Sequence, residues 1–143
     1  MYPEEMVQPM REEVTRLGVS ECRTGADIDK ALATKGTVLA FINSVCGCAA
    51  GNARPGLALA MRHGTKPTAA ITVFAGNDPE AAARLRGAMK EIPPSSPFFA
   101  LFKDGKIVHA VPRHEIEGRS PQDVARNLTT AFDKFCGTTA AQV

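Results

Sequence analysis

The sequence predicts an α/β fold with a mixed central β-sheet flanked by helices and an additional helix at the N-terminus. Two short runs, 37–43 and 70–75, are apolar almost throughout, as expected for strands that are covered on both faces. Segments with helical spacing alternate with these runs, which is typical of α/β proteins. A hairpin pattern over 98–111, with a Lys-Asp-Gly-Lys turn, then adds antiparallel strands and makes the sheet mixed.

The first third of the chain contains two predicted helices and one short strand. Apolar residues recur at helical spacing over 3–17, and Gly18 follows as a stop signal. Residues 19–23 predict a short strand. Thr24 is suited to cap a helix over 26–33, because its hydroxyl can accept a hydrogen bond from a free N–H of the first turn.

Three further helices are predicted after the first apolar run. An alanine-rich helix reaches about His63, and a kink is expected in it because Pro55 cannot donate to the carbonyl of Gly51. A second helix spans about 78–90, with a proline in its favoured first turn. The last helix begins at Ser120 and is amphipathic. Its inward face consists of Val124, Leu128, Ala131, Phe132 and Phe135.

The composition suits one globular domain. Of 143 residues, 44% are apolar and 22% charged, which argues against global disorder. The net charge is only +2 and no long basic run is present, so neither a nucleic-acid nor a membrane partner is indicated. We expect a domain over 1–136 and a flexible tail over 137–143. Without a secretory pattern or an apolar run of about 20 residues, the expected location is cytoplasmic.

The four cysteines are the most informative residues. Cysteines seldom form structural disulfides in a reducing cytosol, so two that are separated by one glycine suggest chemistry. Cys46-Gly47-Cys48 follows a predicted buried strand and precedes a helix. Sites in α/β sheets form beyond the carboxyl ends of strands, and a helix N-terminus favours thiolate over thiol. The motif is therefore a candidate redox site.

Position within the motif suggests a role for each residue. We expect Cys46, nearer the loop, to be the attacking sulfur and Cys48, inside the first turn, to be the resolving thiol. Gly47 leaves room for a partner chain or a bulky thiol. A Cys-X-Cys disulfide closes a small ring whose less favourable geometry makes it easier to reduce. The pair is thus expected to suit exchange with mixed disulfides or isomerisation.

Four other residues are candidate substrate contacts. The Ser96–Pro97 bond precedes a strand, and we expect it to be cis, with the proline facing Cys46 and the preceding backbone available to an extended substrate. The alternative is an ordinary loop proline. Asn52 and Arg54 lie within two turns of Cys46, where a cation could stabilise a thiolate or bind an acidic thiol. The alternative for both is a solvated helix face.

The remaining candidates have weaker signals. We interpret Arg113 and His114 as surface or capping residues, although a histidine could shuttle a proton. Cys136, at the end of the last helix, is either an accessory thiol that receives a disulfide or links chains, or an incidental free cysteine. Cys22 is expected to be a buried small hydrophobe.

Five segments of the chain resemble a known family. They are residues 1–7, 43–55, 73–76, 93–97 and 113–118. The cysteine motif, the proline-interrupted helix and the hairpin are similar to those of thioredoxin-like proteins. More closely, the chain resembles the bacilliredoxins, small bacterial proteins of thioredoxin-like fold with a Cys-Gly-Cys site. The resemblance spans Met1 to about Cys136.

The resemblance implies removal of bacillithiol from mixed disulfides on cytosolic proteins. Carried over to this chain, Cys46 attacks the bacillithiol sulfur and takes the adduct, and Cys48 resolves it. No bound cofactor is implied; bacillithiol is the thiol co-substrate, and the partners are bacillithiolated or otherwise oxidised proteins. Disulfide isomerase or weak reductase activity with the same pair is the alternative.

Two other function classes remain open. Cys46, Cys48, Cys136 and one histidine could supply soft ligands to a metal or an iron–sulfur cluster. No second close Cys/His pair completes a usual zinc pattern, so no metal is expected. A non-enzymatic adaptor is the third class, because a fold does not fix a function.

Overall fold

The computed structural model describes residues 1–137 and has the predicted α/β architecture. One mixed sheet has the strand order β1-β3-β2-β4-β5. Strand β3 pairs in parallel with β1 and β2, and β4 pairs antiparallel with β2 and β5. The strands are β1 (Ser20–Glu21), β2 (Thr37–Asn43), β3 (Ala69–Phe74), β4 (Phe98–Lys103) and β5 (Lys106–Val111).

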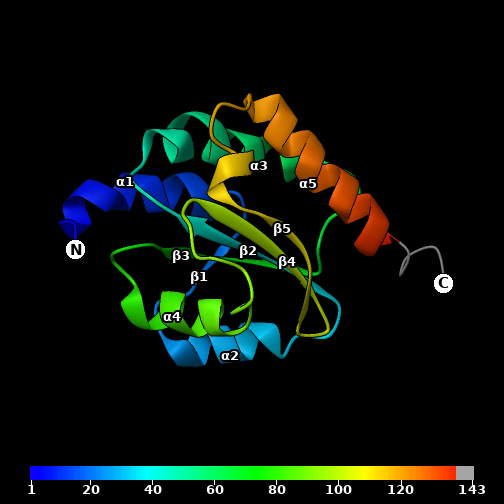
Figure 1. Cartoon of the computed structure of the whole chain (residues 1–143), viewed down its shortest axis with the longest axis horizontal. Helices are drawn as coiled ribbons and strands as arrows, with labels where there is room; N and C mark the ends of the chain where they lie inside the picture. Colours follow the sequence, from blue (N-terminus) through cyan, green and yellow to red (C-terminus); the bar gives the residue numbers. More distant parts are fainter. Residues whose placement is uncertain (138–143) are drawn as a thin grey trace.

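Helices cover both faces of this sheet (Figure 1), with α1, α3 and α5 on one side and α2 and α4 on the other. The residues of β2 alternate between the two cores: Leu39 and Phe41 pack on the first side, and Val38, Ala40 and Ile42 on the second. The helices are α1 (Glu4–Thr15), α2 (Gly25–Leu32), α3 (Arg54–Ala60), α4 (Pro79–Gly87) and α5 (Pro121–Phe135), with short turns η1 (Ala49–Ala53) and η2 (Arg113–Glu115).

Most element predictions are confirmed. The first apolar run is β2 residue for residue, and the second is β3, shifted by one position. Thr24 and Ser120 cap α2 and α5, each accepting a hydrogen bond from a backbone N–H in the first turn. In the hairpin turn, Asp104 and Gly105 both have positive φ, as a two-residue turn between twisted strands requires. Helices α1 and α4 end two to three residues earlier than predicted.

The interruption at Pro55 takes a form that the sequence did not predict. Residues Ala49–Ala53 form a π-helical turn, in which the Arg54 N–H bonds the Ala49 carbonyl, and α3 starts after it. Because Pro55 lies in the first turn of α3, its missing N–H is tolerated there. In place of the expected kink, the chain has a widened π-helical turn directly after the cysteine motif. Such turns often occur at functional sites.

The predicted tail falls largely outside the described part of the chain, since residues 138–143 are not described. Across residues 1–137, no helix has the length and apolar character needed to span a membrane.

Candidate active site

The Cys46-Gly47-Cys48 motif lies just beyond the carboxyl end of β2, the central strand. Sites of α/β proteins form at this edge, where strand ends leave a crevice. Cys46 lines a cavity of about 310 Å³ to which widely separated segments contribute. The lining residues are Tyr2, Ser44, Val45, Cys46, Ala75, Gly76, Ser96 and Arg113.

The two thiols of the motif differ in exposure and in acidity. Cys46 is half-buried, whereas Cys48 is 7% exposed. Hydrogen bonding from the Cys48 side chain lowers the pKa of Cys46, and the Cys48 backbone N–H, 3.4 Å from the Cys46 sulfur, adds to this effect. Burial, followed by the hydrogen bond to Cys46, raises the pKa of Cys48. The exposed sulfur is therefore the better thiolate, and the buried one serves as its donor.

A buried network fixes the loop that carries Cys46. The Cys46 N–H donates to Ser44 Oγ at 3.0 Å, and the Ser44 N–H donates to Asn43 Oδ1 at 2.9 Å. Arg54 Nη1 donates to both Asn43 Oδ1 and the Ser44 carbonyl at 2.9 Å. Its Nε pairs with Glu13 of α1 at 3.0 Å. Through these contacts, α1 and the start of α3 stabilise the conformation of the loop that carries Cys46.

This network corrects the predictions for Arg54. It is 4% exposed, so it lies neither on a solvated helix face nor in contact with a substrate. Its guanidinium is saturated by loop acceptors and by Glu13. Asn52 donates its amide to the Arg119 carbonyl and is not among the residues that line the cavity, so its contact with a substrate stays a prediction.

Of the other predicted contacts, Ser96 and Gly47 border open space at the motif, whereas the contact of Pro97 with Cys46 stays a prediction. The Ser96–Pro97 bond is cis, as predicted, and Pro97 is buried. Ser96 lines the same cavity as Cys46. A Cβ added at Gly47 would meet no atom within 4 Å, so the space beside the motif is open.

Arg113 is the site residue that the sequence interpretation missed. It begins η2 and lines the cavity with Cys46. Its positive charge contributes to the lowered pKa of Cys46 and opposes the rise that burial causes in the pKa of Cys48. Its backbone N–H donates to Ser95 Oγ at 3.1 Å, which ties η2 to the proline-rich loop. Arg113 and Cys46 are far apart in the sequence, so no local pattern indicates that they are close in space. Arg113 does belong to a segment that carries the family resemblance.

Tyr2 was missed for the same reason. Its backbone N–H and carbonyl bond the side-chain amide of Asn77 at 3.0 and 2.9 Å, and this pins the N-terminus beside Gly76 at the cavity. No local pattern in the sequence indicates that the first residues reach the site.

The two remaining cysteines lie away from the site. Cys22 is 4% exposed, as expected, and burial raises its pKa to about 11. Cys136 lies near Thr37, the first residue of β2, whereas Cys46 comes shortly after the last residue of that strand. With a rise of roughly 3.3 Å per strand residue, Cys136 is about 20 Å from the motif. Among the described residues, no metal-binding group joins Cys136 to the motif, and an accessory role for Cys136, by receiving the disulfide or linking chains, stays a prediction.

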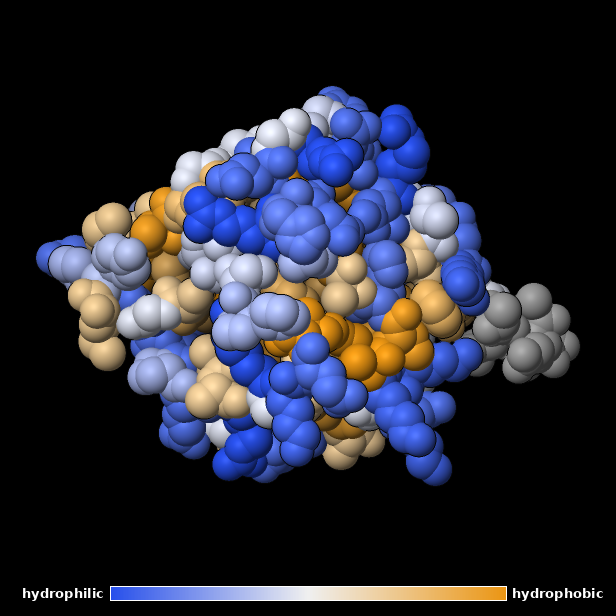
Figure 2. Space-filling view, viewed as in Figure 1, coloured by the Kyte–Doolittle hydropathy of each residue, from blue (hydrophilic) through white to orange (hydrophobic). Residues whose placement is uncertain are grey.

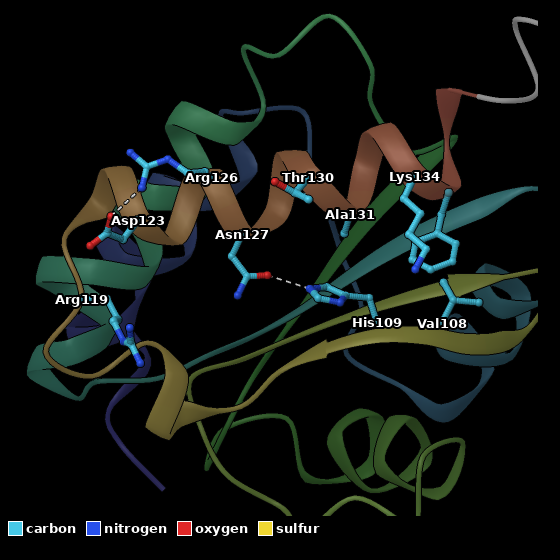
Figure 3. A pocket seen from close by; sticks show the side chains of 10 residues that line it. Val108, His109, Arg119, Asp123, Arg126, Asn127, Thr130, Ala131 and Lys134 are labelled. Atoms are coloured by element: carbon cyan, nitrogen blue, oxygen red, sulfur yellow. Dashed lines mark hydrogen bonds and ion pairs between the residues drawn. The ribbon is translucent and has the colours of Figure 1, made fainter.

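Among residues 1–137, no group of three or more histidine, cysteine or acidic side chains is arranged to hold a metal ion. A second cavity of about 600 Å³ lies between β5 and α5 (Figure 3). Its wall includes His109, whose Nε2 is 2.7 Å from Asn127 Oδ1, and hydrophobic residues gather over β5 on this face (Figure 2). None of the described residues that line this second cavity is a cysteine, so it is separate from the thiol chemistry of the motif.

The fold and the motif together match known proteins. Residues 2–136 match the family described as disulphide isomerase. A bacilliredoxin of Koribacter versatilis is 50% identical over 141 residues, which cover 98% of this chain and 97% of that protein. The chain belongs to the bacilliredoxin family. A bacilliredoxin of Salinibacter ruber is 54% identical over 140 residues, covering 95% of this chain and 82% of that protein.

Solved structures show the same fold at lower identity. The oxidised thioredoxin of Plasmodium falciparum gives a TM-score of 0.56 at 19% identity and covers 82% of this chain and 98% of its own. Trxlp from Edwardsiella tarda gives 0.57 at 18% identity, covering 77% and 98%. This member of the bacilliredoxin family has a thioredoxin fold and is a thiol-disulfide oxidoreductase.

Proposed function

We propose that the protein removes bacillithiol from mixed disulfides on cytosolic proteins, with Cys46 as the nucleophile and Cys48 as the resolving thiol. The observation that carries this assignment is the asymmetry of the two sulfurs: the pKa of Cys46 is lowered and that of Cys48 is raised. Cys46 also lines the cavity, whereas Cys48 is buried behind it. The names of the relatives support bacillithiol as the small thiol.

In the first step, the Cys46 thiolate attacks the bacillithiol sulfur of the mixed disulfide. A bond forms between Cys46 Sγ and that sulfur, and the bond to the target protein's sulfur breaks. The target leaves as a thiolate and takes a proton from water. Hydrogen bonding from Cys48 and the charge of Arg113 lower the pKa of Cys46 and so favour the thiolate that attacks.

In the second step, the adduct on Cys46 is resolved. Cys48 loses its proton and attacks Cys46 Sγ; the Cys46–Cys48 disulfide forms and bacillithiol leaves as a thiolate. The raised pKa of Cys48 keeps this step slow near neutral pH, because little thiolate is present. An external thiol can instead take bacillithiol from Cys46 and so return the motif to its reduced state.

Disulfide isomerisation is a second candidate, favoured by the description of the matching family. When Cys48 resolves slowly, the mixed disulfide between Cys46 and the target protein lasts longer. The target can then rearrange its other disulfides before Cys48 releases it. Refolding of a scrambled disulfide protein by the reduced enzyme would measure this activity, and Cys46→Ser should abolish it.

Mass spectrometry tests the proposed function directly. The reduced protein is incubated with a bacillithiolated model protein and with the same protein in glutathionylated form. We expect release of bacillithiol from the target, and an adduct that accumulates on Cys46 in Cys48→Ser but is absent in Cys46→Ser. An adduct retained in Cys46→Ser would reverse the roles of the two cysteines. Equal rates with both targets would contradict bacillithiol specificity.

A further inference from the structure

Arg113 occupies a distinctive position in the cavity. Among the described residues that line it, Arg113 alone has a positively charged side chain. The other arginine close to the motif, Arg54, is buried and engaged by Glu13 and the loop. An anionic ligand that enters this cavity therefore meets one available guanidinium.

The backbone of Arg113 is fixed while its side chain is held loosely. The backbone N–H donates to Ser95 Oγ, so the residue is anchored to the loop that carries Ser96. The guanidinium Nη2 pairs with Glu117 Oε2 at 3.1 Å, and the two side chains are 44% and 59% exposed. An exposed ion pair of this kind contributes little stability, so a ligand carboxylate can replace Glu117 at small cost.

We propose that Arg113 is the specificity residue of the cavity: its guanidinium exchanges Glu117 for a carboxylate of the small thiol whose sulfur Cys46 attacks. The inference rests on the proposed function and adds to it the class of thiol that the site prefers, namely anionic ones. Bacillithiol carries carboxylates and belongs to this class. Glu117 acts as the internal competitor that occupies Arg113 when no ligand is bound.

The exchange step itself is that of the proposed function. The Cys46 thiolate bonds to one sulfur of a disulfide, the sulfur–sulfur bond breaks, and the second sulfur leaves as a thiolate. Arg113 forms and breaks no covalent bond in it. The guanidinium offsets the repulsion between an anionic disulfide and the Cys46 thiolate, and it gives the carboxylate a fixed place beside that sulfur.

Three small disulfides that differ in charge test the proposal. Second-order rates of Cys46 modification are measured with 3,3′-dithiodipropionate (anionic), bis(2-hydroxyethyl) disulfide (neutral) and cystamine (cationic). The quantity compared is the ratio of the anionic to the cationic rate. A change in the fraction of Cys46 thiolate alters all three rates equally, so it cancels in this ratio.

We expect Arg113→Gln to lower the ratio by about tenfold, because one directional charge pair is lost. Arg113→Lys keeps the charge without the planar fork and should lower it by about threefold or less. Glu117→Gln removes the competitor and should raise it by about threefold. Arg126→Gln is the matched control: it removes the same charge from an exposed site beside the second cavity (Figure 3) and should change the ratio less than about twofold.

The outcomes separate this proposal from the proposed function. An unchanged ratio in Arg113→Gln, or an equal fall for all three probes, would overturn the specificity role. Loss of selectivity in Arg113→Gln while the wild-type protein fails to release bacillithiol from its target would support Arg113 and overturn the bacillithiol assignment. Thermal unfolding of each variant controls for folding.

Discussion

The two ends of strand β2 each hold a cysteine, and they differ in almost every respect that matters for reactivity. At the carboxyl end, Cys46 faces a cavity, accepts hydrogen bonds and lies near Arg113, so its pKa is lowered. At the amino end, Cys136 packs against the core beside Thr37, and burial raises its pKa. Hydrogen-bond donors and positive charge near a cysteine, and not the residue type, therefore lower the pKa of its thiol.

Replacing the cysteine at each end of β2 by serine should give the largest difference in activity. Cys46→Ser is expected to reduce thiol-disulfide exchange with a mixed disulfide by at least about 100-fold, because the attacking thiolate is lost. Cys136→Ser should change the rate less than about twofold. Rates are measured by release of the small thiol. A large loss in Cys136→Ser would show that the two ends cooperate, for example between two copies of the chain.

The buried hydrogen bonds of Arg54 behind the Cys46 loop are expected to contribute strongly to the free energy of unfolding. Arg54→Ala should lower the free energy of unfolding by about 3 kcal/mol, because it removes the buried donor of the Ser44 carbonyl, one of the two donors to Asn43 Oδ1, and the partner of Glu13. Urea unfolding measures this change. Arg126→Ala, which removes an exposed arginine paired with Asp123, is the control and should cost less than about 0.5 kcal/mol. A similar cost for both would mean that the loop does not depend on Arg54.

The smallest expected effect concerns how Cys46 acquires its acidity. Thiolate is the reactive form, so the rate of alkylation rises with pH through the pKa, and a lowered pKa places that rise at lower pH. Because the Cys48 side chain is the largest cause of the lowering, Cys48→Ala should raise the pKa of Cys46 and slow its alkylation at neutral pH. Cys48→Ser keeps an O–H donor and should preserve most of the lowering.

Iodoacetamide labelling over a pH series, read at the Cys46 peptide, checks this. The Cys22 peptide serves as the internal reference, since burial raises its pKa to about 11 and its labelling should begin only at high pH. Identical profiles for Cys48→Ala and Cys48→Ser would show that Arg113 and the backbone amides dominate instead.

Features that depend on neighbours along the chain could be predicted from the amino-acid sequence. Apolar runs and helical spacing located β2, β3 and most helices, because those periodicities report which faces are covered. Thr24 and Ser120 were identified as caps since capping is a contact within four residues. The Cys-Gly-Cys motif and the cis bond at Pro97 also have local signals.

The set of side chains that meet at the motif became known from the packing of the elements. Arg54 was expected at the substrate and turned out to support the loop, because Glu13 and Asn43 approach it from two other elements. Arg113 and Tyr2 come from distant parts of the chain and reach the cavity through the order of the strands and the path of the loops. Contacts between distant segments depend on how the helices and strands pack. Apolar periodicity of two or 3.6 residues shows which face of an element is buried, but it does not show which other element covers that face.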